Sequence, residues 1–134
     1  MKLQFLGAYK NFGLLIVRLG LGLSFILHGY PKMFGGPEVW KKLGAVMGNL
    51  GIDVYPAFWG FMAAFAEFGG GIMVLLGFYF RPAVFLMAFT MAMALQMHLF
   101  KEDPFKVYSH ALELCVVFSG LLFVGPGRFS VDGD

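Results

Sequence analysis

The chain has 134 residues, of which 59% are hydrophobic and 13% are charged, and its mean hydropathy is +0.76. A soluble domain of this length cannot bury so much apolar surface, so the composition excludes a water-soluble globular protein. The net charge is +2, and the basic residues are spread through the polar segments without forming a patch. This distribution argues against nucleic acid as a partner and leaves the lipid bilayer as the evident one.

Four long apolar runs are separated by charged residues, and each approaches the roughly 20 residues that a membrane-spanning helix needs. The runs are rich in leucine and alanine and lack the alternation of a membrane barrel, which favours helices over strands. We predict an all-α fold with spans at about residues 11–31, 57–79, 82–100 and 107–125. Short links between the last three spans predict an up-down transmembrane four-helix bundle, with residues 1–134 forming a single domain.

The link between the first two spans is longer and contains an amphipathic segment from Glu38 to Leu50. Its apolar residues recur at helical spacing opposite Lys41 and Lys42, which predicts a short helix lying in the membrane interface. Small residues allow membrane helices to approach one another closely. We therefore expect helix contacts at Gly20, Gly22, Gly69 to Gly71, Ala88 and Ala92.

Two charged residues lie deep within the predicted spans. Counted inward from Lys32 and Asp53, the charged residues that bound the first two apolar runs on one face, Arg18 and Glu67 each lie about 13 residues into their runs, near the middle of the bilayer. A charged side chain there costs at least about 2.5 kcal/mol on insertion scales, so such residues usually have a partner. We predict a structural ion pair between Arg18 and Glu67.

The three histidines fall near the ends of the predicted spans, at one depth and on one face of the membrane. His28 ends the first span, His98 ends the third, and His110 begins the fourth. Glu113 follows His110 by three residues, on the same side of its helix, and Gln96 precedes His98 by two. We therefore predict His28 and Glu113 as catalytic residues, and His28, Gln96, His98, His110 and Glu113 as cofactor-binding residues.

Imidazole and carboxylate groups together suit three kinds of chemistry: metal binding, proton relay, and hydrogen bonding to the carbonyls of a quinone. Sequence spacing does not choose among them, although a polar ligand pocket, and hence a quinone, is favoured over a metal. In the alternative interpretation, the histidines are simply tolerated near the membrane interface, since equal depth alone does not bring side chains together.

Three stretches of the chain resemble the DoxX family of small four-helix membrane proteins. They are RLGLGLSFILHGYPKMFG at Arg18 to Gly35, AEFGGGIMVLLGFYFRPA at Ala66 to Ala83, and GPGRFSVD at Gly125 to Asp132. The resemblance implies a bacterial or archaeal inner membrane protein with both termini in the cytoplasm. It also implies a set of polar positions characteristic of the family: Arg18, His28, Lys32, Glu67, Arg81, Glu113 and Arg128.

The resemblance and the polar residues together predict a membrane subunit of a quinone-linked oxidoreductase system. The sequence has no nucleotide, haem or iron–sulfur motif, so the electron donor is expected in a partner chain. The alternative is a non-catalytic accessory or scaffold subunit of a larger membrane complex. Either role predicts other protein subunits, or further copies of this chain, as partners.

Overall fold

The computed structural model describes residues 2–133, and these residues form helices joined by short connections. Four helices are long and apolar enough to cross a membrane: α1 (Lys10–Met33), α3 (Pro56–Leu76), α4 (Phe80–Phe100) and α5 (Phe105–Val124). A 3-10 helix, η1 (Gln4–Tyr9), precedes α1, while α2 (Pro37–Gly44) and η2 (Ala45–Leu50) lie between α1 and α3. The all-α transmembrane fold and the short helix after the first span are therefore confirmed.

Residues that tolerate or impose particular backbone angles mark the ends of the long helices. Gly77 caps the end of α3, and its φ of 66° allows its N–H to donate to the carbonyl of Val74 in a left-handed conformation. Gly125, with φ of 88°, caps the end of α5. Pro37 and Pro56 begin α2 and α3, where the missing N–H of proline costs no helical hydrogen bond.

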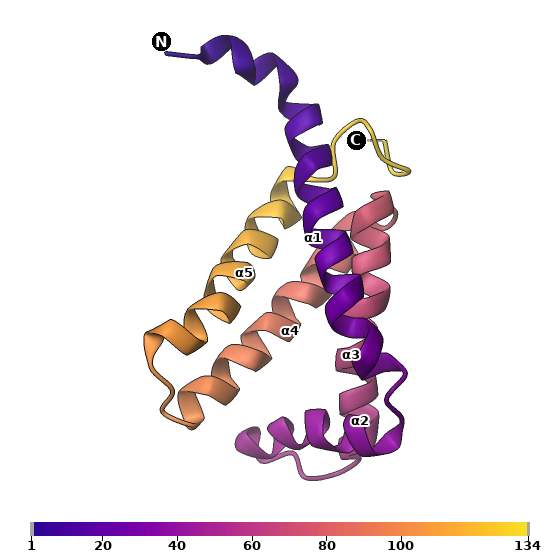
Figure 1. Cartoon of the computed structure of the whole chain (residues 1–134), viewed down its shortest axis with the longest axis vertical. Helices are drawn as coiled ribbons and strands as arrows, with labels where there is room; N and C mark the ends of the chain where they lie inside the picture. The colour runs from indigo at the N-terminus through magenta and orange to yellow at the C-terminus, as the bar shows by residue number, and fades with distance from the viewer. Residues whose placement is uncertain (1, 134) are drawn as a thin grey trace.

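The long helices pack in chain order, each against the next, and the bundle is open between its first and last members. α1 packs along α3, α3 along α4, and α4 along α5. No Cα atom of α1 comes within 8 Å of one in α5, although the rings of Phe25 and Phe118 bridge the two helices at 5.3 Å. Figure 1 shows both termini at one end of the bundle and α2 at the other. We call these ends the termini face and the α2 face.

Glycines bring α1 and α3 into backbone contact. A Cβ atom on Gly22 would lie 2.8 Å from the amide nitrogen of Leu75, and one on Gly71 would lie 2.9 Å from the carbonyl oxygen of Gly22. These two predicted contact positions are correct. Gly20 is a wrong prediction, because it points away from the bundle and has no neighbour within 4 Å of an added Cβ.

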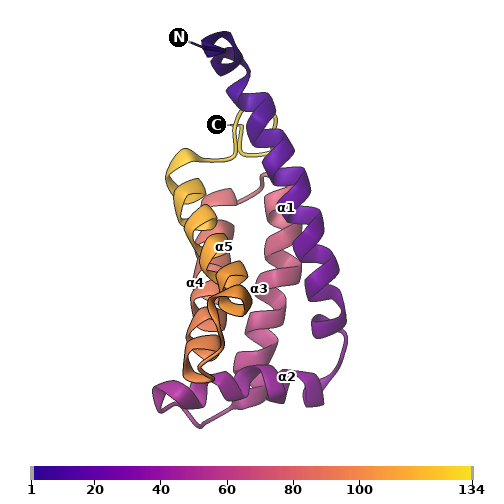
Figure 2. The same cartoon turned by 60° about the vertical axis from the view of Figure 1, so that its left-hand side comes forward.

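α2 crosses the end of α3 at the α2 face and continues through η2 towards α4 (Figures 1 and 2). Gly44 packs on the carbonyl of Pro56, and Gly60 packs on that of Trp40, so neither glycine has room for a Cβ atom. The ring of Trp40 also meets that of Phe61, edge to face, at 5.0 Å. The predicted interfacial helix is thus docked on the bundle as well as amphipathic.

Candidate functional site

Arg18 is buried near the termini face, where its guanidinium is surrounded by backbone carbonyl oxygens. Nε donates to the carbonyl of Val74 at 3.1 Å and Nη2 to that of Leu75 at 2.9 Å, both near the end of α3. Nη1 donates to the carbonyls of Phe129 at 2.7 Å and Pro126 at 3.4 Å. The last carbonyls of a helix lack intrahelical partners and carry the negative end of its dipole, so a cation satisfies them.

The C-terminal tail, residues 125–133, follows α5 back across the termini face. The amide of Val131 donates to the carbonyl of Leu76 at 3.0 Å. The carboxylate of Asp132 accepts from the amides of Tyr79 at 3.0 Å and Phe80 at 2.8 Å, and so caps the start of α4 from 52 residues away. The GPGRFSVD motif and Arg18 therefore form a structural clamp that joins α1, α3 and α4.

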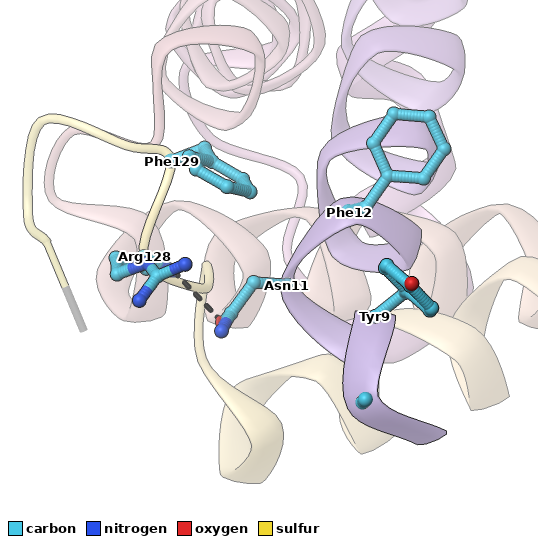
Figure 3. Close-up of a pocket in the computed structure, with 6 residues that line it drawn as sticks. Tyr9, Asn11, Phe12, Arg128 and Phe129 are labelled. Atoms are coloured by element: carbon cyan, nitrogen blue, oxygen red, sulfur yellow. Dashed lines mark hydrogen bonds between the residues drawn. The ribbon is translucent and has the colours of Figure 1, made fainter. Parts of the chain in front are cut away.

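A shallow pocket of about 370 Å³ lies where the tail crosses α1 (Figure 3). It is lined by Tyr9 at the end of η1, by Phe12 in the first turn of α1, and by Arg128 and Phe129 from the tail. The amide of Arg128 donates to Oδ1 of Asn11 at 3.0 Å, which fixes the tail on α1. The pocket combines aromatic rings with one guanidinium, a composition typical of the lipid headgroup region.

Lys32 and Glu67 form an ion pair inside the membrane-spanning part of the bundle. Nζ of Lys32 donates to Oε2 of Glu67 at 2.7 Å, and the side chains are 37% and 8% exposed. Nε1 of Trp40 donates to the backbone carbonyl of Lys32 at 3.1 Å, which ties α2 to the end of α1. The prediction that Glu67 forms an ion pair with Arg18 is therefore wrong.

The displacement of α1 along α3 explains that error. Gly29, near the end of α1, packs beside Phe68 in the middle of α3, whereas Trp40 of α2 packs on Gly60. Eight residues of α3, about 12 Å, separate these two contacts. α1 therefore stops short of the α2 face, which places Arg18 near the termini face and Lys32 within reach of Glu67.

The same displacement places His28 deeper than the other two histidines, so the prediction of one common depth is wrong. His28 continues the stripe of α1 that packs on the core through Leu14, Leu21 and Phe25, and its ring lies 6.2 Å from that of Phe25. Nevertheless, His28 is exposed, because α5 does not close against α1 at this level. Lys32 follows one turn later on the same side of α1. His28, Lys32 and Glu67 form what we call the polar cluster.

His98 and Gln96 form hydrogen bonds with the segments that connect the helices at the α2 face. Nδ1 of His98 lies 2.8 Å from the carboxylate of Asp103, in the link between α4 and α5. The side chain of Gln96 accepts from Asn49 and donates to the carbonyl of Val46, both at 3.3 Å, and so joins α4 to η2. These contacts take the two residues away from His28 and give them a role in holding the loops.

His110 and Glu113 are exposed on α5. Glu113 lies on the opposite side of the helix from the buried Ala111, since two residues turn an α-helix by about 200°. Within residues 2–133, no group of three or more His, Cys, Asp or Glu side chains is placed to hold a metal ion. The structure thus separates Glu113 from His28 and gives no support to a histidine metal site.

Comparison with known proteins agrees with this architecture. The model of the DoxX family matches residues 13–100, more than half of the chain. The chain belongs to the DoxX family. It is 29% identical to the inner membrane protein YphA of Escherichia coli over 134 aligned residues, which cover 94% of this chain and 92% of YphA. It is also 29% identical to the inner membrane protein YqjF of the same organism, with 92% of each chain covered.

No solved structure matches the chain significantly. The relatives and the four spanning helices identify this DoxX protein as a multi-pass inner membrane protein. The structure also divides the polar positions that the family resemblance implied. Arg18, Arg81 and Arg128 lie at the termini face, and Arg81 donates to the carbonyl of Leu122 at 3.0 Å. His28, Lys32 and Glu67 belong to the polar cluster, and Glu113 is exposed on α5.

Residue chemistry alone missed the importance of Lys32, because Lys32 stands at the end of its apolar run and looks like an ordinary interfacial lysine. The available signal was the family resemblance, which included this position. The other missed residue is Asp132, whose capping role depends on a contact between the tail and a helix that begins 52 residues earlier.

Proposed function

We propose that this DoxX protein is a membrane subunit of a quinone-linked oxidoreductase system and that the quinone head group binds beside His28. The observation that supports this proposal is the exposure of His28 on the core-facing stripe of α1, at the level where α1 and α5 diverge. A lipid-soluble ligand can approach such a position from the bilayer, and an imidazole can donate a hydrogen bond to a quinone carbonyl.

The ion pair beside His28 supplies groups that exchange protons. Reduction of a quinone to a quinol consumes two electrons and two protons. In the proposal, a donor protein delivers the electrons, while Lys32, Glu67 and His28 lie where protons are required. Ionisable residues within a membrane commonly mark such pathways. This assignment keeps His28 from the predicted site and replaces Glu113 with the pair formed by Lys32 and Glu67.

Quinone binding can be followed through Trp40, whose indole is bonded to Lys32. In a Trp59→Phe background, Trp40 is the one remaining tryptophan, and its fluorescence in nanodiscs would be titrated with decylubiquinone. We expect saturable quenching, with binding weakened about tenfold, or about 1.4 kcal/mol, by His28→Ala. The matched control is His98→Ala, which removes an imidazole that already pairs with Asp103 and should leave the affinity unchanged.

Equal affinities for the wild type and His28→Ala would contradict the location, and the absence of saturable quenching would contradict the quinone itself. In the second case the accessory role is the better description. That role predicts that deleting the chain weakens the assembly of a membrane complex, while substitutions in the polar cluster leave the activity of the complex intact.

A further inference from the structure

The outer face of α5 carries a regular row of exposed residues that the proposed quinone site does not use. The row is Lys106, His110, Glu113, Val117, Gly120 and Val124, and every member is exposed. Successive members are separated by four, three, four, three and four residues. This spacing is the heptad pattern by which one helix packs along another. We call the row the α5 seam.

The seam faces away from the rest of the chain. The buried residues of α5 are Ala111, Phe118 and Leu121, and α4 is the long helix that packs along it. Gly120 has no atom within 4 Å of an added Cβ, whereas Gly22 and Gly71 meet backbone atoms inside the bundle. A glycine on a lipid-facing surface lowers helix propensity without serving any contact within the chain, but it permits close approach of another helix.

The ionisable residues of the seam, Glu113 and His110, indicate what kind of surface packs against it. Glu113 is eight residues into α5, about 12 Å along the helix from Phe105, and it faces lipid rather than the bundle. A carboxylate at that depth is unfavourable unless it has a hydrogen-bonding partner. His110 lies one turn away on the same side and supplies a ring N–H. The seam therefore carries both an acceptor and its complementary donor.

We infer that the α5 seam packs against the same seam of a second copy of this chain, in a parallel dimer. Both copies insert in the same orientation, so the two-fold axis runs along the membrane normal and the two α5 helices are parallel. Glu113 of one copy accepts from His110 of the partner subunit, and the reciprocal bond forms on the other side of the axis. The offset of three residues, about 4.5 Å, is within the reach of these two side chains.

Cysteine cross-linking in native membranes tests the seam directly. In a Cys115→Ser background, Val117→Cys, Gly120→Cys and Val124→Cys would be oxidised with copper phenanthroline, with Ser119→Cys and Phe123→Cys as matched controls. All five positions are exposed, but the last two lie off the seam. We expect disulfide-linked dimers at the three seam positions and none at the controls. Equal cross-linking on and off the seam would overturn the inference.

A second measurement separates specific pairing from random collision. Single-molecule photobleaching of the labelled full-length chain in bilayers gives the dimer dissociation constant. Gly120→Leu and Glu113→Leu should each raise this constant about tenfold or more. Both changes add apolar groups to a lipid-facing surface, so they do not disfavour the folded monomer. Gly20→Leu, at an equally open position on α1, is the control and should have no effect.

A wild-type chain that remains monomeric at all densities would overturn the dimer. Seam positions that cross-link to a different polypeptide would assign the surface to that partner instead. The quinone titration of His28→Ala has a separate readout, so failure of the dimer leaves the proposed function unaffected, and the reverse also holds.

Discussion

At the scale of single residues, the two buried charged side chains are satisfied differently: Arg18 bonds to backbone carbonyls and Glu67 to the side chain of Lys32. Half-buried polar side chains follow the pattern of Arg18. Arg18 binds four carbonyl oxygens, Trp40 binds the carbonyl of Lys32, and Gln96 binds that of Val46. Among the described residues, no buried side-chain nitrogen or oxygen lacks a hydrogen-bond partner. Carbonyl groups at helix ends are numerous in a small bundle, and they compete with carboxylates for each intramembrane cation.

The ion pair between Lys32 and Glu67 allows a test of how much a carboxylate in this bundle depends on its cation. We expect Lys32→Leu to destabilise the fold by about 2 to 3 kcal/mol, because it leaves a buried carboxylate unpaired. The value is below that of a fully buried pair, since the Lys32 side chain is 37% exposed. The double variant Lys32→Leu, Glu67→Leu should recover most of the loss, measured by reversible unfolding in detergent.

The control for this cycle is the exposed pair of Lys41 and Glu38 on α2, whose charged atoms lie 3.8 Å apart. Removing either partner should change the unfolding free energy by less than about 0.5 kcal/mol. If the double variant is as unstable as Lys32→Leu alone, the cost does not come from an unpaired carboxylate.

At the scale of secondary-structure elements, the position of α1 along α3 decides which side chains meet. Gly22 and Gly29 set this position by admitting the backbone of α3. The short helix α2 packs on the part of α3 that α1 does not reach. Gly44 of α2 contacts Pro56, and Gly60 of α3 contacts Trp40 of α2. Helix lengths could be predicted from the sequence, but this register could not, because it depends on which of 19 glycines face a neighbour.

Gly60→Ala tests whether the docking of α2 depends on close backbone approach. An added Cβ would overlap the carbonyl of Trp40, and backbone atoms of two packed helices cannot move apart cheaply. We expect a loss of about 2 to 3 kcal/mol in unfolding free energy and faster hydrogen exchange across α2.

The matched control for that substitution is Gly20→Ala, where the same methyl group enters open space. It should stabilise α1 by about 0.5 to 1 kcal/mol through helix propensity alone. A similar loss of stability in both variants would show that the glycine contact between α2 and α3 is not the cause.

At the scale of the whole molecule, the tail completes the fold by binding three helices at the termini face. Arg18→Lys should release it, because one ammonium group cannot replace a planar guanidinium that bonds four carbonyls. We expect the amides of Val131 and Asp132 to exchange with solvent about tenfold faster, measured by hydrogen exchange in nanodiscs. Arg128→Lys is the control, because the guanidinium of Arg128 only stacks on the exposed ring of Phe129. This variant should not change the exchange rates.

Much of the architecture could be predicted from composition and charge spacing: the four spans, their order and the interfacial helix. The site could be predicted only in part. The sequence identifies His28 and Glu67 as intramembrane polar residues, but their partners depend on contacts between segments far apart in sequence. The separation of Glu113 from His28 follows from the rotation of α5, which apolar spacing in a lipid environment does not reveal, since exposed and buried faces are both apolar.

The reach of Arg18 across the sequence also has a consequence for synthesis. Its bonds to Val74 and Leu75 span 56 and 57 residues, whereas its bond to Phe129 spans 111. At about 5 to 20 residues per second, the ribosome needs roughly 6 to 22 s to make the last of these partners after Arg18. The first helix is therefore inserted with its arginine only partly solvated by protein. During that interval, we expect lipid phosphates and water to coordinate a cation that the finished chain encloses.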